Sequence, residues 1–587
     1  MSAKMRNINE IIARTLELER EGEGKLLTLE EAIKRYVKPK VSLYLACGLP
    51  GPTAAVREIV RQYWGENPEF VLIQSAISGY SMFLIYANMV KDLIFSVCPI
   101  SGPSGKIIQK VYSDKSIGFE NWSLCSFQQR LMAGALGVSF MPTRSIIGSN
   151  MALDNKDTFQ EIEDPFGSKN RTGVVKALNP DVCIVHGCIA DVYGNTVLTA
   201  PYGEDVWGPR ASTNIIVTVE KIVPTDVIRQ YSSMVSIPGH TVDAVCEVPL
   251  GVHPFGVTNP GINGFDAYGS DREFNRDLQT SFADSDKMDA WIKEWILECP
   301  THEHYLKKLG GTRINSLRGM MTGDLWNYDY SFASPPVEAG EDYTKDEIMS
   351  VVAAREIVKS VEKAQHKAML AGAGAGLLAS WLAYYLLRAG GYEIELIQGN
   401  GQIGYLPQPG ESILRSGSAA RSTKMMTDTI TTHGVFVGGK HNKCISLLGA
   451  GEIDKYGNIN STRTSEGFFL SGSGGGNDSA VAKEVIVVVE QSTRRFVDKI
   501  AFITSPGDRV STIVSSRGVF KRPASGEELQ LYACFPDPEL KSLEERIAQV
   551  QANTGWKLKL AEKVEEVAKP SQEELQLLRS LLPAGMV

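Results

Sequence analysis

Short apolar runs alternate with amphipathic segments along most of this chain. Runs such as VCIVHGCIA (182–190) and VIVVVE (485–490) are typical of buried β-strands. The segments AAVREIVRQYW (54–64), SFQQRLMAGALG (126–137) and ASWLAYYLLRAG (379–390) instead have helical patterns. The alternation predicts an α/β fold with open sheets, in which ligands bind at loops beyond the carboxyl ends of the strands.

The same landmarks occur twice, in the same order. Asp191-Val-Tyr-Gly-Asn195 is matched by Asp454-Lys-Tyr-Gly-Asn458, and each follows an apolar strand. The strand at 215–223 corresponds to that at 485–493, and the Pro-Gly turn at 236–239 to that at 504–507. We interpret the D-x-Y-G-N unit as a tight turn rather than a catalytic element. Its repetition predicts two tandem, similarly folded α/β domains.

A polar, proline-containing segment separates the two halves. The expected organisation is an N-terminal helix at 1–26, a first domain at 27–321, a linker at 322–341 and a second domain at 342–587. The uncharged stretch from Met369 to Leu387 has the length of a membrane span. Its glycines favour a strand, a Gly-rich loop and a packed helix instead. No membrane partner is therefore expected.

Composition narrows the class of ligand. The net charge of −8 provides no basic field for nucleic acid, so a small-molecule ligand is favoured. The nine cysteines show no metal-ligand spacing, and reduced thiols in a cytoplasmic protein are expected. The eight histidines form no metal-spaced cluster. His186 lies in an apolar strand and is interpreted as a core residue, and His253, in the segment LGVHPFG, is a candidate base.

Glycine-rich loops are the candidate binding elements. They are Cys47–Gly51, Gly399–Gly404 and Ser471–Asp478, with a small-residue loop at Ser101–Gly105. Glycine lets a backbone approach a ligand closely and turn its N–H groups toward an anion. The second loop spells G-x-G-x-x-G, but a Leu-Pro pair follows where a Rossmann helix should begin. The chain has no P-loop, no G-x-S-x-G elbow and no HExxH motif.

Longer runs of residues carry a specific resemblance. Residues 119–144, 241–254 and 303–317 resemble the A subunit of the family I CoA-transferases, represented by glutaconate CoA-transferase. Residues 447–462, 468–480 and 493–508 resemble the B subunit of the same family. The resemblance implies a fused A and B pair, with an acyl-CoA site at the junction of the two domains. It also implies an assembly of several copies, which for a fused chain is a homo-oligomer.

One departure from the family pattern concerns the reaction itself. In family transferases a glutamate directly after a strand attacks the thioester and forms a glutamyl-CoA intermediate. The matching position in this chain is Gly399, in the sequence Gln398-Gly-Asn-Gly401. A glycine cannot form that intermediate. Other members of the fold lack this glutamate as well and act on acyl-CoA as a decarboxylase or as a hydrolase.

The resulting interpretation is an acyl-CoA hydrolase or lyase. It would hydrolyse a β-keto or unsaturated dicarboxylic acyl-CoA, cleave it at a C–C bond or decarboxylate it, without a covalent glutamyl-CoA intermediate. Glu120 is the candidate base, by analogy with the hydrolase. The candidate substrate or oxyanion residues are Gly48, Ser101, Ser104, Gly399, Asn400 and Gly401, and the candidate CoA-binding residues are Gly474, Gly475 and Gly476. No metal and no further cofactor are expected, because coenzyme A enters with the substrate. Two alternatives stay open: a CoA-transferase using another carboxylate, and a non-catalytic acyl-CoA-binding protein.

Overall fold

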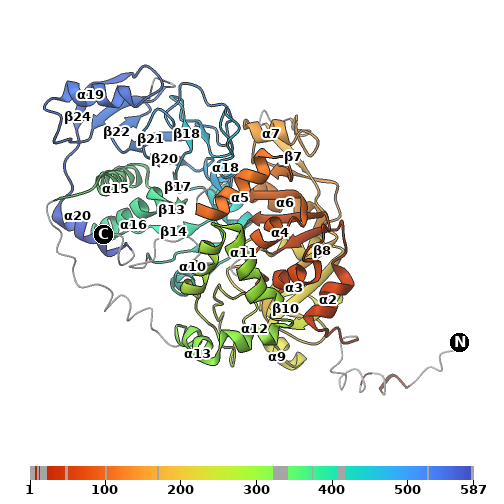
Figure 1. Cartoon of the computed structure of the whole chain (residues 1–587). Helices are drawn as coiled ribbons and strands as arrows, with labels where there is room; N and C mark the ends of the chain where they lie inside the picture. Colours follow the sequence, from red (N-terminus) through yellow and green to blue (C-terminus); the bar gives the residue numbers. More distant parts are fainter. Residues whose placement is uncertain are drawn as a thin grey trace.

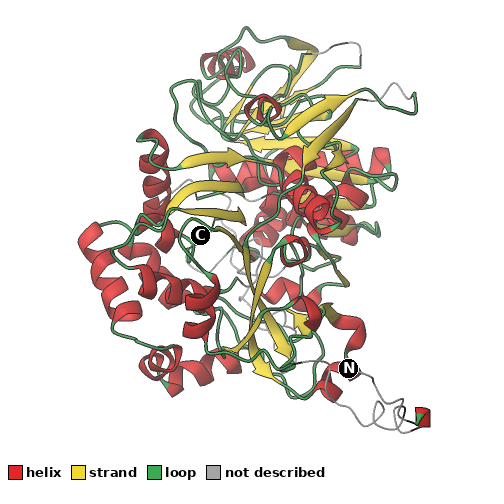
Figure 2. Ribbon diagram, turned by 90° about the vertical axis from the view of Figure 1, so that its right-hand side faces the viewer, coloured by secondary structure: helices red, strands yellow, loops and turns green. Residues whose placement is uncertain are grey.

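The structure is a computed structural model of the whole chain. It describes residues 7–9, 12, 23–46, 51–77, 79–99, 102–167, 171–321, 342–372, 374–407, 417–524, 526 and 528–582. The expected linker at 322–341 and most of the expected N-terminal helix at 1–26 lie outside these residues. The two halves lie side by side (Figure 1), and strands with helices packed beside them form each half (Figure 2).

The first half is built on a mainly parallel sheet. Its strand order is β11-β9-β8-β1-β2-β3-β4, and β10 pairs with both β8 and β12. A small antiparallel sheet of order β5-β7-β6 lies beside it. The strands are β1 (Ser42–Leu45), β2 (Phe70–Ala76), β3 (Val90–Val97), β4 (Gly118–Asn121), β5 (Phe140–Thr143), β6 (Phe159–Ile162), β7 (Thr172–Lys176), β8 (Val182–Ala190), β9 (Thr196–Leu198), β10 (Asn214–Ile222), β11 (Val235–Ile237) and β12 (Ala244–Glu247).

Helices cover this sheet and extend the first half beyond it. Helix α6 begins with a capping box in which the Ser123 hydroxyl accepts from the amide of Ser126, so its start is fixed locally. The helices are α2 (Leu29–Tyr36), α3 (Thr53–Tyr63), α4 (Met82–Tyr86), α5 (Gly102–Ser113), α6 (Leu124–Ala135), α7 (Asn150–Asp154), α8 (Trp207–Ala211), α9 (Thr225–Gln230), η1 (Ser232–Met234), η2 (Gly239–Thr241), α10 (Arg272–Ser281), α11 (Ser285–Ile292), η3 (Lys293–Leu297), α12 (His302–Leu309) and α13 (Gly311–Gly319).

The second half repeats the centre of this arrangement. Its strand order is β16-β15-β14-β13-β17-β20-β21-β22-β23-β24. In the first sheet β1 lies between β2 and β8, all parallel, and in the second β13 lies in the same way between β14 and β17. The strands are β13 (Ala368–Ala371), β14 (Glu395–Gln398), β15 (Gln402–Ile403), β16 (Met425–Met426), β17 (Cys444–Leu448), β18 (Glu452–Ile453), β19 (Ile459–Asn460), β20 (Glu484–Val489), β21 (Val510–Ser515), β22 (Gly518–Lys521), β23 (Gln530–Cys534) and β24 (Leu560–Glu566).

Two helices form the main cover of the second sheet. Helices α15 and α16 pack against each other and against β20. The stretch expected to imitate a membrane span is strand β13 followed by helix α16, and no helix among the described residues is long and apolar enough to cross a membrane. The helices are α15 (Lys345–Ala364), α16 (Ala375–Ala389), α17 (Gly417–Ser422), η4 (Ile430–Val437, a π-helix), α18 (Gly476–Ser479), α19 (Leu543–Ala552) and α20 (Gln572–Ser580).

The central strands are buried on both faces. Along β1, Leu43 and Leu45 belong to one hydrophobic cluster, and Tyr44 belongs to the cluster on the opposite face of the sheet. Along β20, Ile486 and Val487 alternate between two clusters in the same way. Because side chains alternate across a strand, a continuous apolar run serves two cores. The expected tandem α/β fold is confirmed.

The repeated turns have the same hydrogen bonds in both halves. The Asp191 carboxylate accepts from the amides of Tyr193 (3.1 Å) and Asn195 (3.0 Å), and the Asn195 side chain accepts from the amide of Gly239 (2.8 Å). The second turn has the same three hydrogen bonds. The Asp454 carboxylate accepts from the amides of Tyr456 (2.9 Å) and Asn458 (3.0 Å), and the Asn458 side chain accepts from the amide of Gly507 (2.9 Å). The prediction of a structural turn is confirmed, since the side chains of this Asp and Asn accept hydrogen bonds from backbone amides in both halves.

Candidate active site

The Gly-rich loop at 471–476 of the second half lies against the first half. The amide of Cys98 donates to the Ser471 carbonyl (3.0 Å), and the amide of Gly474 donates to the Ser96 carbonyl (2.9 Å). The amide of Leu124, at the start of α6, donates to the Gly474 carbonyl (3.0 Å). These bonds join backbone that lies far apart in sequence. They fix the relative position of the two halves at this point.

Asp478, just beyond this loop, binds the N-terminus of α6. Its carboxylate accepts from the amide of Cys125 (2.8 Å) and from the hydroxyls of Ser123 (2.8 Å) and Ser145 (2.7 Å). Asp478 is only 2% exposed. A buried charge needs such donors, and the positive end of the α6 dipole adds to them. The carboxylate is therefore held rigidly between the two halves.

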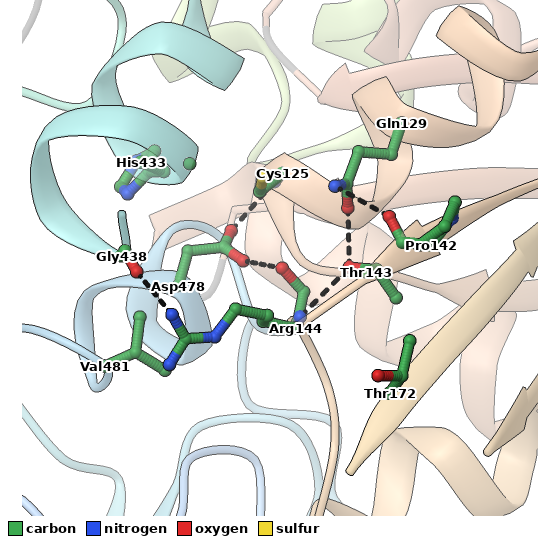
Figure 3. A pocket seen from close by; sticks show the side chains of 12 residues that line it. Cys125, Gln129, Pro142, Thr143, Arg144, Thr172, His433, Gly438, Asp478 and Val481 are labelled. Atoms are coloured by element: carbon green, nitrogen blue, oxygen red, sulfur yellow. Dashed lines mark hydrogen bonds between the residues drawn. The ribbon is translucent and has the colours of Figure 1, made fainter. Parts of the chain in front are cut away.

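A cavity of about 200 Å³ lies at this junction. Figure 3 shows residues of both halves around it: the side chains of Cys125, Thr143 and Arg144 from the first half, and those of His433 and Asp478 together with the Gly438 backbone from the second. Pockets of this kind are the default candidates for ligand binding. We treat the cavity as the candidate active site.

Arg144 is the cationic side chain on the wall of this cavity. One guanidinium nitrogen donates to the Gly438 carbonyl (2.9 Å), and in the part of the chain that the structure describes Arg144 makes no ion pair. A guanidinium has five N–H groups and suits the planar oxygens of a carboxylate or phosphate. Arg144 can therefore bind an anionic group of a ligand.

His433 is the buried imidazole at the same junction, on the π-helix η4. It is 2% exposed, and neither ring nitrogen has a hydrogen-bond partner among the described residues. Burial lowers the pKa of His433 below its usual value, and the negative charge of Asp478 partly opposes this shift. The ring is thus a neutral imidazole with an unused acceptor and an unused donor.

Cys125 lies beside the same cavity. Burial, assisted by the negative charge of Asp478, raises the pKa of its thiol well above the usual value. The nucleophilic form of cysteine is the thiolate. Cys125 is accordingly a protonated wall residue and not an activated nucleophile.

The predicted site residues at 399–401 form the tight turn between β14 and β15. A Cβ atom at Gly399 would lie 2.7 Å from Nε2 of His433, so the imidazole occupies the space beside this glycine. Gly401 has φ +103°, and a Cβ atom there would lie 1.9 Å from the Thr427 carbonyl oxygen, so this position needs glycine. The amide group of Asn400 is buried and has no partner among the described residues.

The predicted CoA-binding residues lie at the junction as well. Of these, Gly474 and Gly476 use their amides within the protein, with Ser96 and Ser473 as acceptors. Gly475 faces the His433 ring, since a Cβ atom there would lie 2.9 Å from Cε1. A role of these glycines in binding CoA stays a prediction, and the hydrogen bonds show that two of the amides are already engaged.

Glu120 lies on β4, where its carboxylate forms an ion pair with Arg130 and accepts from Trp122 Nε1 (2.7 Å). The Arg130 side chain is 4% exposed, so removing Glu120 would leave a nearly buried guanidinium without its charge partner. The role of Glu120 as a base stays a prediction. Ser104 donates to Gln279 Oε1 (3.0 Å) within the first half. Gly48 and Ser101 lie outside the described residues.

His433 and Asp478 were not among the residues predicted from sequence. Asp478 was visible only as the end of a Gly-rich stretch, and His433 lies in the segment TTHGVFVGG (431–439), which matches no catalytic motif. Its location beside Gly399 and Gly475 depends on a π-helix and on packing between distant segments. The spacing of residues along the sequence indicates neither the π-helix nor this packing. Arg144 was noted only as the end of a matching stretch.

Comparisons with known proteins identify the family. Residues 26–248 match the family model described as Coenzyme A transferase. The B subunit of 3-oxoadipate CoA-transferase from Pseudomonas knackmussii is 31% identical over 260 residues, which is 41% of this chain and 93% of that protein. The A subunit of glutaconate CoA-transferase from Acidaminococcus fermentans is 28% identical over 313 residues, 50% of this chain and 95% of that protein. The chain belongs to the coenzyme A transferase family.

Two further matches concern the fold and the length of the chain. The apoenzyme of an acyl-CoA transferase from Escherichia coli O157:H7 shares the fold, with a TM-score of 0.63 at 15% identity over 96% of this chain and 99% of that chain. An uncharacterized protein of Archaeoglobus fulgidus is 30% identical over 239 residues, 40% of this chain. The chain spans about half, 52%, of that relative's length. The relatives include both subunit types, as a fused pair requires.

Proposed function

We propose that this chain is an acyl-CoA hydrolase or lyase that uses water as the acceptor and forms no glutamyl-CoA intermediate. The observation that carries the proposal is Gly399, which stands where the family resemblance places the nucleophilic glutamate. Nucleophilic catalysis needs a side chain at that point. The space beside this glycine is filled by the His433 ring, 2.7 Å from where a Cβ atom would lie.

The carboxylate that does lie in the pocket is poorly suited to replace that glutamate. Asp478 accepts three hydrogen bonds, from one amide and two hydroxyls, at 2.7–2.8 Å. These donors stabilise its negative charge and hold its oxygens in place, which reduces nucleophilicity. A reaction without a carboxylate nucleophile fits this environment better.

An acidic acyl group is the substrate class that the pocket favours. Arg144 offers a guanidinium to a terminal carboxylate. The named acids of the relatives, glutaconate and 3-oxoadipate, are both dicarboxylic. The first is unsaturated and the second is a β-keto acid. We propose their CoA esters as the first substrates to assay, with coenzyme A present only as part of the substrate.

The test is turnover without an acceptor acid. The purified chain is incubated with 3-oxoadipyl-CoA or glutaconyl-CoA, with and without added acetate, and products are identified by mass spectrometry. We expect turnover in the absence of acetate. Water attack at the thioester releases free CoA and the acid, and water attack at the 3-oxo carbon releases succinate and acetyl-CoA. Turnover that requires acetate would overturn the proposal.

A CoA-transferase that uses another carboxylate is the second candidate, because the named relatives are CoA-transferases. It predicts formation of acetyl-CoA from glutaconyl-CoA only when acetate is present. Any turnover excludes a purely acyl-CoA-binding protein. From the family resemblance we also propose a homo-oligomer in the cytoplasm, and light scattering on the purified chain checks the assembly.

A further inference from the structure

His433 has an environment that core packing alone does not explain. Its ring lies between two glycines of the second half: Cβ atoms at Gly399 and Gly475 would lie 2.7 and 3.0 Å from Nε2. Both positions therefore exclude any larger residue while the ring stays in place. The residue also lines the junction cavity. The imidazole thus meets both the turn at 399–401 and the cavity.

Buried polar groups without a partner occur on the ring and on residues next in sequence or nearly so to the two glycines that meet it. Both ring nitrogens of His433, both amide atoms of Asn400 and the hydroxyl of Ser473 are buried without a partner among the described residues. These side chains are 2%, 4% and 6% exposed. A buried polar group without a partner costs about 1–3 kcal/mol, so native structures rarely retain several together unless water or a ligand completes them. This cluster points to a ligand with polar atoms.

The helix that carries His433 supports the same conclusion. Eight residues, Ile430–Val437, adopt π-helical backbone, with Asp428 accepting from the Thr431 amide (2.9 Å) before it. π-helical segments are rare and less well hydrogen-bonded than α-helix, and they occur frequently at functional sites. A segment used only for packing would be expected to adopt the regular helix.

We propose that His433 is the proton-transfer residue of this enzyme. This inference rests on the proposed function, because it assumes that water is the acceptor. The unprotonated ring nitrogen of His433 removes a proton from the attacking water as the water oxygen bonds to the carbonyl carbon of the acyl group. The bond from that carbon to its leaving group then breaks, and the leaving group takes its electron pair. The imidazolium returns the proton to the leaving group.

The step balances for either cleavage. If the C–S bond breaks, the leaving group is the CoA thiolate, and the products are the free acid and CoA thiol. If the C–C bond of a β-keto ester breaks, the leaving group is the thioester enolate, and the products are an acid and a shortened acyl-CoA. One water is consumed in each case, and His433 ends neutral. No other reactant is required.

The charges around the ring suit a base. Asp478 on α18 favours the imidazolium that forms during the reaction. Cys125 on α6 is held as a neutral thiol. The guanidinium of Arg144 extends along the cavity wall and is exposed. Because burial keeps the pKa of His433 below about 6.5, the resting ring is neutral and ready to accept a proton at neutral pH.

The experiment compares His433→Gln with His441→Gln, which changes an exposed histidine a few residues along the chain. Turnover of 3-oxoadipyl-CoA and glutaconyl-CoA is measured across pH, and the melting of each variant is recorded. We expect kcat to fall about 10²–10⁴-fold in His433→Gln and to stay unchanged in His441→Gln. In the unsubstituted chain kcat/KM should rise with pH through a value below about 6.5, and this limb should vanish in His433→Gln.

A His433→Gln rate within tenfold of the unsubstituted chain would overturn the inference. A kcat/KM profile of the unsubstituted chain without an acid limb would overturn it as well, and this second result does not depend on whether the variant folds. The proposed function fails separately. Turnover that requires acetate refutes the proposed function, whereas acceptor-independent turnover that persists in His433→Gln refutes only the role of His433.

Discussion

The contact between Gly399 and His433 predicts a specific energetic coupling. In Gly399→Ala the new methyl carbon would lie 2.7 Å from Nε2, whereas ordinary contact begins near 3.4 Å. The ring must therefore retreat by about 0.7 Å. Retreat is restricted, because a Cβ atom on the opposite glycine, Gly475, would lie only 2.9 Å from Cε1. Overpacking of a core by one methyl group costs about 1–3 kcal/mol.

A double-mutant cycle measures this coupling. Gly399→Ala, His433→Ala and the double variant are unfolded in urea and by heat, with Gly449→Ala as the matched control because a Cβ atom there meets nothing within 4 Å. We expect Gly399→Ala to destabilise the chain by about 1–3 kcal/mol, and by less than about 0.5 kcal/mol once the ring is removed. The control should behave like the unsubstituted chain.

The same variant should affect turnover. A displacement near 1 Å of a catalytic group can cost about 10²-fold in rate. We expect kcat of Gly399→Ala to fall by about that factor, with little change in KM. Two results would refute the reasoning: equal destabilisation by Gly399→Ala in the presence and absence of the His433 ring, or full activity in Gly399→Ala.

Three further substitutions test the rest of the site. Asp478→Asn removes the buried charge and replaces one of its two accepting oxygens by an NH2 group, which must face either the Cys125 amide or the Ser123 and Ser145 hydroxyls. Stability should therefore fall by about 2–3 kcal/mol in urea titration, and a loss under about 0.5 kcal/mol would contradict this. Arg144→Ala should raise KM for glutaconyl-CoA about tenfold and leave KM for acetyl-CoA, which has no terminal carboxylate, unchanged; equal effects on both esters would count against the assigned contact. Glu120→Gln should lower the melting temperature by several degrees, because Arg130 loses its charge partner. The kcat of this variant should stay within a few-fold of the unsubstituted chain. If its kcat/KM profile lost the rise at acid pH, Glu120 would be supported as the base instead.

Much of the fold could be predicted because its buried strands are continuous apolar runs in the sequence. The run at 182–190 is buried at every position in β8. A strand that serves two cores must be apolar throughout, so the pattern is visible without any tertiary information. The turn at 191–195 could be predicted as well, since aspartate, glycine and asparagine each satisfy a local backbone requirement. The stop of α16 at its two glycines, Gly390 and Gly391, follows from the same chemistry.

The site was less predictable because its contacts are non-local. The amides of the loop at 474–476 suggested anion binding, yet the partner of Gly474 is Ser96, 378 positions earlier. Glu120 suggested a base, and its ion-pair partner Arg130, ten positions later on α6, becomes a neighbour only once the chain turns from β4 into that helix. The sequence around His433 matches no catalytic motif. That Gly399 takes the place of the family glutamate stays a prediction, and the structure adds that the His433 ring fills the space beside this glycine.

The most direct test of the absence of a carboxylate nucleophile is chemical trapping during turnover. The chain is mixed with glutaconyl-CoA and borohydride or hydroxylamine, and the intact protein and its peptides are examined by mass spectrometry. The account predicts no modified glutamate or aspartate while acyl-CoA is consumed. A hydroxamate or a reduced side chain at any carboxylate would contradict it.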